Sequence, residues 1–355
     1  MSSSGGLGFG GFLVGLGLGW YIFTFLNVTA NVFAWLLILA GAAFILSALF
    51  MLRQARTSFR RLTNGFVGGV ILSLFLTSGI GFMTDLLGGG VAGPYTVEGT
   101  RTYSGKIDGN VYLEVNNFNG PVSVSSWAKA EYGIELKIKA RGNSQQEAEK
   151  NLADFQVNLN ENMVQDQKKL VLAYNIASYA QNRYSITVGV FLPARAPTDL
   201  KLESSNGAIS IEGIRGHSVT VTTTNGGLRL DDVYVDIIRC QTSNGPVTGK
   251  LEATDTSIVT SNGKVELTLP CSISGQYVLR TSNGPIGLKV SSSANTGFDL
   301  DMSTSNGNVN IDLPSIELSL NTRTAKRART TGYDVKSIRI AITASTSNGN
   351  IDLAK

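Results

Sequence analysis

Apolar and polar positions divide the chain into two parts with different periods. Residues 7–26, 33–52 and 66–83 are three continuous apolar stretches without a charged side chain. Each is long enough to cross the ~30 Å hydrocarbon core of a bilayer as a helix, whereas helices of a soluble domain keep a polar face. The pattern therefore predicts a transmembrane domain at residues 1–90 with three membrane helices.

The arginines of this first part predict its orientation. All four lie in the connection 53–64, and the connection 27–31 has none. Because basic loops stay in the cytoplasm, the N-terminus is predicted to be cytoplasmic and everything after residue 88 extracellular. The predicted location is the cell membrane, with membrane lipid as a partner of a multi-pass chain.

The second part follows a period of about 20 residues that is marked by Asn-Gly dipeptides. The apolar position four residues before each Asn, and another three residues after it, place alternating strands on both sides of a tight turn. The asparagines are Asn119, Asn206, Asn225, Asn244, Asn262, Asn283, Asn306 and Asn348.

Constant columns of apolar residues favour stacked coils over a series of separate hairpins. We expect a single-chain β-solenoid of about eight or nine coils, each about 4.8 Å above the last. The recurring Asn is predicted to form a structural ladder of side-chain amides, and the Gly after it to accept a positive φ. A ligand-binding edge is the alternative use of the Asn row.

Domain limits follow from the same pattern. A linker is predicted at residues 91–99 and the extracellular solenoid at residues 100–355, with a strand–helix–strand insert at about 125–200. The insert contains the capping box that begins at Ser144, which predicts a helix to about residue 158 that caps the N-terminal end of the stack. No cap follows the last Asn-Gly, so the C-terminal coil is predicted to be an edge for self-association.

One Asn-Gly turn is missing near residue 327, where the sequence is rich in basic residues. We expect one coil to carry a longer loop there, with Arg323, Lys326, Arg327 and Arg329 as candidate binding residues. An anionic polymer, a lipid headgroup or a partner protein fits this charge, and a solvated surface loop is the alternative.

Composition argues against catalysis and nucleic-acid binding. The chain has 30 basic and 26 acidic residues, one histidine and two cysteines. The basic excess lies in residues 1–90, so it indicates a membrane loop and no nucleic-acid surface. A single histidine supports neither a metal site nor a catalytic network, and no cofactor or metal is expected. Glu212 and Asp231 are candidate neighbours on adjacent coils, but a solvated face is the expected use of both.

The cysteines differ in their position within the repeat. Cys240 falls in an apolar column, whereas Cys271 falls in another register. Whether they form a disulfide stays open.

The Thr-Ser-Asn-Gly coils, the insert before them and the phrase Val190-Phe-Leu-Pro-Ala194 resemble the putative-adhesin family of β-strand-repeat domains. The resemblance covers about residues 95–355. It implies a solenoid on the cell surface of largely unknown function, and it transfers no binding residue.

Together these features predict a membrane-anchored extracellular module without enzymatic activity. Its role is expected to be adhesion or cell-envelope binding or scaffolding, with envelope polysaccharide or a surface protein as partner. The alternative is an envelope sensor that passes ligand binding through the membrane spans to a cytoplasmic partner.

Overall fold

A computed structural model describes residues 12–14, 18 and 93–355 of the chain. The chain divides into two units, 1–91 and 92–355.

The predicted fold class of three membrane helices plus a solenoid is wrong in its first component. Within the residues that the structure describes, no helix is long and apolar enough to cross a membrane. The spans predicted at 7–26, 33–52 and 66–83 lie outside the described residues, apart from four positions of the first. The fold that the structure describes is all-β with one short α-helix.

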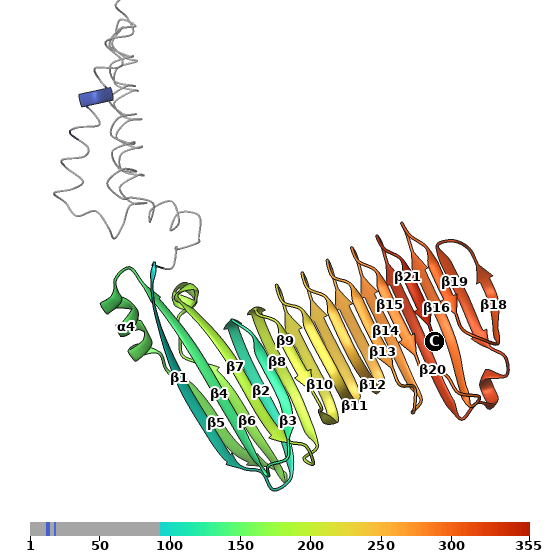
Figure 1. Cartoon of the computed structure of the whole chain (residues 1–355), viewed down its shortest axis with the longest axis horizontal. Helices are drawn as coiled ribbons and strands as arrows, with labels where there is room; N and C mark the ends of the chain where they lie inside the picture. Colours follow the sequence, from blue (N-terminus) through green and yellow to red (C-terminus); the bar gives the residue numbers. More distant parts are fainter. Residues whose placement is uncertain (1–11, 15–17, 19–92) are drawn as a thin grey trace, which may run out of the picture. The chain divides into compact units, whose positions relative to one another are not determined.

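The described unit is a β-solenoid, in which equivalent strands of neighbouring coils pair in parallel (Figure 1). We call the face built mainly from strands that precede the Asn-Gly corners the leading face. Its order is β5 (Val157–Val164), β6 (Gln167–Tyr174), β2 (Asn110–Asn119), β8 (Thr198–Asn206), β10 (Arg215–Thr223), the second part of β11 (Leu228–Thr242), the second part of β12 (Val247–Thr260), β14 (Gly275–Thr281), β20 (Ile338–Thr346), β16 (Thr296–Thr304), β19 (Ala325–Thr330) and β18 (Ile316–Asn321).

The trailing face is built mainly from strands that follow the corners. Its order is β1 (Tyr95–Lys106), β4 (Glu131–Gly142), β7 (Tyr184–Pro193), β3 (Val122–Trp127), β9 (Ile209–Glu212), the first parts of β11 and β12, β13 (Val265–Leu269), β15 (Ile286–Val290), β21 (Ile351–Ala354) and β17 (Val309–Asp312).

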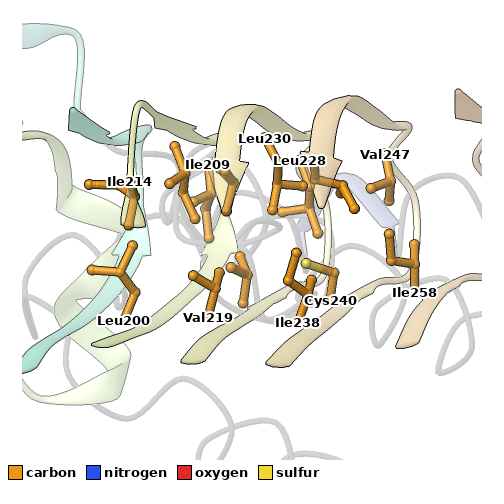
Figure 2. Close-up of a cluster of buried hydrophobic side chains, with 14 of the residues drawn as sticks. Leu200, Ile209, Ile214, Val219, Leu228, Leu230, Ile238, Cys240, Val247 and Ile258 are labelled. Carbon is orange, nitrogen blue, oxygen red and sulfur yellow. The ribbon is translucent and has the colours of Figure 1, made fainter. Parts of the chain in front are cut away.

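The core is a set of apolar columns that run along the stack between the two faces. Figure 2 shows Leu200, Val219 and Ile258 of the leading face pointing toward Ile209 and Val247 of the trailing face. In the two columns that flank the corners, four residues before and three after each Asn, no side chain is more than 3% exposed. Because a buried Val, Leu or Ile contributes about 1.5–3 kcal/mol, these columns hold the coils together, as the sequence predicts.

The N-terminal insert contributes a whole coil to the stack. Strands β6 and β7, joined through the 3₁₀ helix η1 (Ser178–Arg183), stack outside β2 and β3. Beyond them, β5 extends the leading face and β4 with β1 extends the trailing face, both in antiparallel pairs. The insert therefore supplies a coil as well as a cap.

The helix of the insert begins where its capping box predicts. In α4 (Gln145–Asp154) the Ser144 Oγ accepts a hydrogen bond from the Glu147 amide at 3.1 Å. The helix is four residues shorter than predicted, because Val157 already belongs to β5. It packs against β1 and β4, and it buries Ala148 and, just beyond its end, Phe155.

At the C-terminal end, the order of coils in space differs from their order in sequence. The last coil, β20 with β21, lies between the coils β14–β15 and β16–β17 and is paired on both sides. The prediction that the last coil is an uncapped edge for self-association is therefore wrong. The end of the stack is β16–β17, and the hairpin β18–β19 covers the outer edge of β16.

The glycine of each Asn-Gly corner is required by space and not by a positive φ. Gly120 is the one corner glycine with φ in the left-handed region, at 113°. A Cβ on any later corner glycine would stand only 1.8–2.3 Å from the carbonyl oxygen of the corner glycine in the adjacent coil. The predicted reason for these glycines was wrong, since the coils approach so closely there that no side chain fits.

The two adjacent glycines of one corner give a matched test. Gly226→Ala places a Cβ 1.9 Å from the Gly207 carbonyl oxygen, whereas Gly227→Ala meets only the Pro246 ring, at 3.3 Å. We expect Gly226→Ala to lower the free energy of unfolding by about 3 kcal/mol and Gly227→Ala by less than about 1 kcal/mol. Urea unfolding of the two variants, followed by far-ultraviolet circular dichroism, measures the difference. Equal losses would contradict the close-approach explanation.

Candidate functional site

Seven of the eight repeated asparagines form one continuous row along the corner. In the row each Nδ2 donates to the Oδ1 of the preceding side chain at 2.8 Å. Its order is Asn206, Asn225, Asn244, Asn262, Asn283, Asn348 and Asn306. Because both polar atoms of the inner members are used within the row, it has the geometry of a structural ladder.

Asn119 lies opposite Asn206 but does not join this row. Its Nδ2 donates instead to the carbonyl of Tyr184, at 2.8 Å, and so holds the insert coil. A second row, made of threonine side chains, runs beside the asparagine row, and it was not predicted from the sequence. Two residues before the Asn, six buried or nearly buried threonines donate to the corner-glycine carbonyls of the adjacent coil at 2.8–3.2 Å: Thr223, Thr242, Thr260, Thr281, Thr346 and Thr304. Their constant place in the Thr-Ser-Asn-Gly motif was the signal for it.

Replacing one amide in the middle of the row tests its contribution. In Asn244→Asp, a carboxylate would face the Asn225 Oδ1 that now accepts a hydrogen bond. We expect a loss of about 1–3 kcal/mol at pH 7. Only the protonated acid can donate, so its pKa in the folded state is raised above the usual ~3.9. The variant therefore keeps its stability below pH ~3.9 and loses it as the pH rises through the raised pKa.

The matched control is Asn206→Asp, because Asn206 stands first in the row and only accepts within it. Melting temperatures of both variants relative to the parent, at pH 3.5 and pH 7, separate the two cases. A deficit in Asn244→Asp that does not change with pH would show that the donated bond is not the cause.

The four basic candidate residues lie on the hairpin that covers the end of the stack, where the sequence predicted a long loop. Three of the four are engaged by neighbouring groups, and Lys326 is half-buried. The contacts are Arg323 Nη1 to the Gly307 carbonyl at 2.9 Å, Arg327 to Asp301 at 3.3 Å, and Arg329 to Asp299 at 3.5 Å and to Asp334 at 3.1 Å. These side chains hold the hairpin against β16 and against the corner at Gly307. Their role in binding a ligand stays a proposal.

No cluster of acids or histidines suited to a metal ion occurs in residues 93–355 or the few described before them. Glu212 and Asp231 do lie side by side on adjacent strands, as the spacing suggested. Asp231 is already in an ion pair with Arg229. The exposed His217 is bonded to Asp236 at 2.8 Å, and this hydrogen bond raises the pKa of the imidazole.

Both cysteines are free thiols in the interior of the solenoid. Cys240 is 3% exposed and Cys271 is 4% exposed. Burial raises the pKa of each thiol to about 12. They are therefore packing residues with almost no reactive thiolate at neutral pH.

A surface groove of about 560 Å³ lies near the N-terminal end of the stack. Three connections surround it, 107–110 between β1 and β2, 127–130 between β3 and β4, and 193–197 between β7 and β8. Backbone hydrogen bonds tie the connections together: Ala194 N to Trp127 O at 2.8 Å, and Ile107 N to Ala130 O at 3.2 Å. The groove is therefore held by the rigid stack, and its volume lies in the range of ordinary ligand sites.

An aromatic pair and two basic side chains give this groove its chemistry. The Trp127 ring stacks on Phe191 with 5.2 Å between centroids, and the Lys129 Nζ lies 4.5 Å from the indole centroid. Gly133 makes room for the indole, since a Cβ there would stand 2.7 Å from it. Arg195 is exposed at the groove, and within the described part of the chain it forms no ion pair or hydrogen bond. We call Trp127, Lys129 and Arg195 with the three connections the insert groove; Phe191 supports the Trp127 ring but does not line the groove.

The sequence analysis missed the insert groove, because its residues come from the non-repeating part. Periodicity gives no column in which Trp127 or Arg195 stands out. The only local signal was the pair of prolines in Pro193-Ala-Arg-Ala-Pro197, which marks a turn that exposes the arginine between them.

Comparisons with known proteins find a matching domain family and several similar solved structures. Residues 193–354 match the domain family described as Toastrack DUF4097. No curated protein matches the chain. Similar solved structures include a "putative cell adhesion protein" from Clostridium sporogenes, at 13% identity and a TM-score of 0.40, which covers 73% of this chain and 99% of that one. A "putative adhesin" from Bacteroides fragilis has 12% identity and a TM-score of 0.34, and covers 72% and 97%. Over residues 193–354, the chain is thus similar to the Toastrack DUF4097 domain family.

Proposed function

We propose that the solenoid is a non-catalytic, adhesion-like binding module that works outside the cell, and that the insert groove is its contact site. One observation carries the proposal: the groove places an unpaired arginine and an aromatic rim on a rigid support. Rigid presentation lowers the entropy that binding must overcome.

The chemistry of the insert groove favours a surface protein over envelope polysaccharide. Alanines and prolines supply half of its lining residues. Phe191 and Lys129 already pack on the Trp127 ring, so its face is not free to stack on a sugar. Trp and Arg are also the residues that concentrate binding energy at protein interfaces. An extended segment with one apolar and one acidic side chain fits the groove best.

The sensor alternative depends on membrane spans that the described part of the chain does not supply. No contact in residues 93–355 favours it.

Binding of the full-length chain to isolated envelope material from its own host tests the proposal. We expect Arg195→Ser to weaken binding at least tenfold at low salt, a loss of about 1.4 kcal/mol, and the difference to shrink at about 0.5 M salt. Arg280→Ser is the control, because it removes an exposed arginine from the leading face far from the groove in sequence. Lys326→Ser, on the hairpin, tests the site that the sequence suggested.

Protease treatment of the envelope material separates the two partner classes. Loss of binding supports a protein partner, and retained binding points to polysaccharide instead. Equal binding by Arg195→Ser and the parent would overturn the insert groove as the contact site. A loss confined to Lys326→Ser would transfer the role to the hairpin.

A further inference from the structure

Within the described residues, the solenoid leaves four strand edges open at its two ends. The stack ends in β1 and β5 at the N-terminal side and in β17 and β18 at the other. Unpaired edges are sites where another strand can add, and proteins usually shorten, bend or cover them. β1, with 12 residues, is the longest of the four.

The two edges at the far end carry such protection. β18 contains an irregularity between Leu318 and Leu320 that shifts its register, and it bears the charge of Glu317. β17 has four residues, and its Val309 amide is already bonded to the Arg323 carbonyl at 2.9 Å. A bulge and a covering loop both discourage pairing with another chain.

Within residues 93–355, the β1 edge has neither a bulge nor a covering loop. It contains no proline, and its register against β4 is unbroken from Tyr95 to Lys106. Within residues 93–355, no other strand pairs with it. Its side chains alternate between an exposed row, from Thr96 to Lys106, and a half-buried row that faces α4.

We infer that β1 pairs antiparallel with β1 of a second copy of this chain, around a two-fold axis at Thr102. In an antiparallel pair, opposite residues share a face of the sheet. An axis at Thr102 sets Glu98 opposite Lys106 of the second copy, twice by symmetry, and Thr100 opposite Ser104. Opposite charges at directly paired positions stabilise such a pair.

The same register also suits the half-buried row. It brings Gly99 opposite Gly105 and Arg101 opposite Tyr103 of the second copy, and arginine packs favourably on a tyrosine ring. Moving the axis to Arg101 would set the two arginines directly against each other, which is destabilising. Moving it to Thr100 would carry Lys106 past the start of the partner strand and lose both Glu–Lys pairs. Charge therefore selects a single two-fold register.

The dimer does not depend on the proposed function, since β1 and the contact residues of the insert groove are different parts of the chain. A two-fold dimer would present two insert grooves and so raise the apparent affinity for a surface that carries many partners.

Cysteine cross-linking of the full-length chain tests the register. The native cysteines are buried, with pKa values raised to about 12, so an introduced exposed thiol is the reactive one. Thr102→Cys sets two thiols opposite each other on the axis, within the reach of a disulfide. We expect it to form a covalent dimer under mild oxidation, read on a non-reducing gel.

Thr100→Cys is the matched control, because Thr100 is exposed on the same row but lies opposite Ser104 of the second copy. We expect it to cross-link at least tenfold more slowly, and the double variant Thr100→Cys/Ser104→Cys to regain the fast rate. Equal rates for Thr102→Cys and Thr100→Cys, or faster oxidation of the latter, would overturn the register. Covalent capture of a different protein in place of a second copy would overturn the dimer.

Charge reversal gives an independent measurement without new thiols. Lys106→Glu would place two acids opposite each other, so we expect its dimer to dissociate at least tenfold more readily in sedimentation equilibrium. Lys289→Glu, an exposed lysine on β15, is the control with the same change in charge. A parent protein that stays monomeric at every concentration up to its solubility limit would refute the proposal.

Discussion

The close approach of successive coils at the Asn-Gly corner is the contact on which the rest of the structure depends. There, one coil lies against the corner-glycine carbonyl of the next with no room for a Cβ. This approach brings the asparagine amides to 2.8 Å from each other and lets the threonine hydroxyls reach the same carbonyls. The buried columns on either side then follow at the spacing of neighbouring strands, so the corner sets the register of the whole stack.

The two ends of the stack are covered in different ways. At the C-terminal end a later coil inserts before the terminal one, and a hairpin held by arginine–aspartate pairs covers the edge of β16. At the N-terminal end the insert adds a coil, a helix and antiparallel strands, yet leaves the outer edge of β1 unpaired along its whole length within the described unit. The ends, and not the repeats, therefore carry the features that set this chain apart.

The repeats supply a rigid support, and the insert supplies the side chains that are available to bind a partner. The asparagine and threonine side chains of the corner are used by their neighbours in the stack, which leaves them few free polar atoms for a partner. The insert groove lies where the repeat is interrupted, so its arginine is not engaged by an adjacent coil. Such a site gains rigidity from the stack without being constrained by the repeat.

The sequence by itself determined the parts that repeat. Its period fixed the apolar columns, the asparagine row and the corners, because each depends on contacts between equivalent positions of adjacent coils. The sequence also identified the start of α4 from the capping box. The membrane helices that it predicts are not part of the described fold. Only the tertiary structure decided that Asn348 lies between Asn283 and Asn306, since equivalent coils pair equally well in several orders. It also decided why the corner glycines are needed and where Trp127 and Arg195 meet, because both depend on distances between segments far apart in the chain.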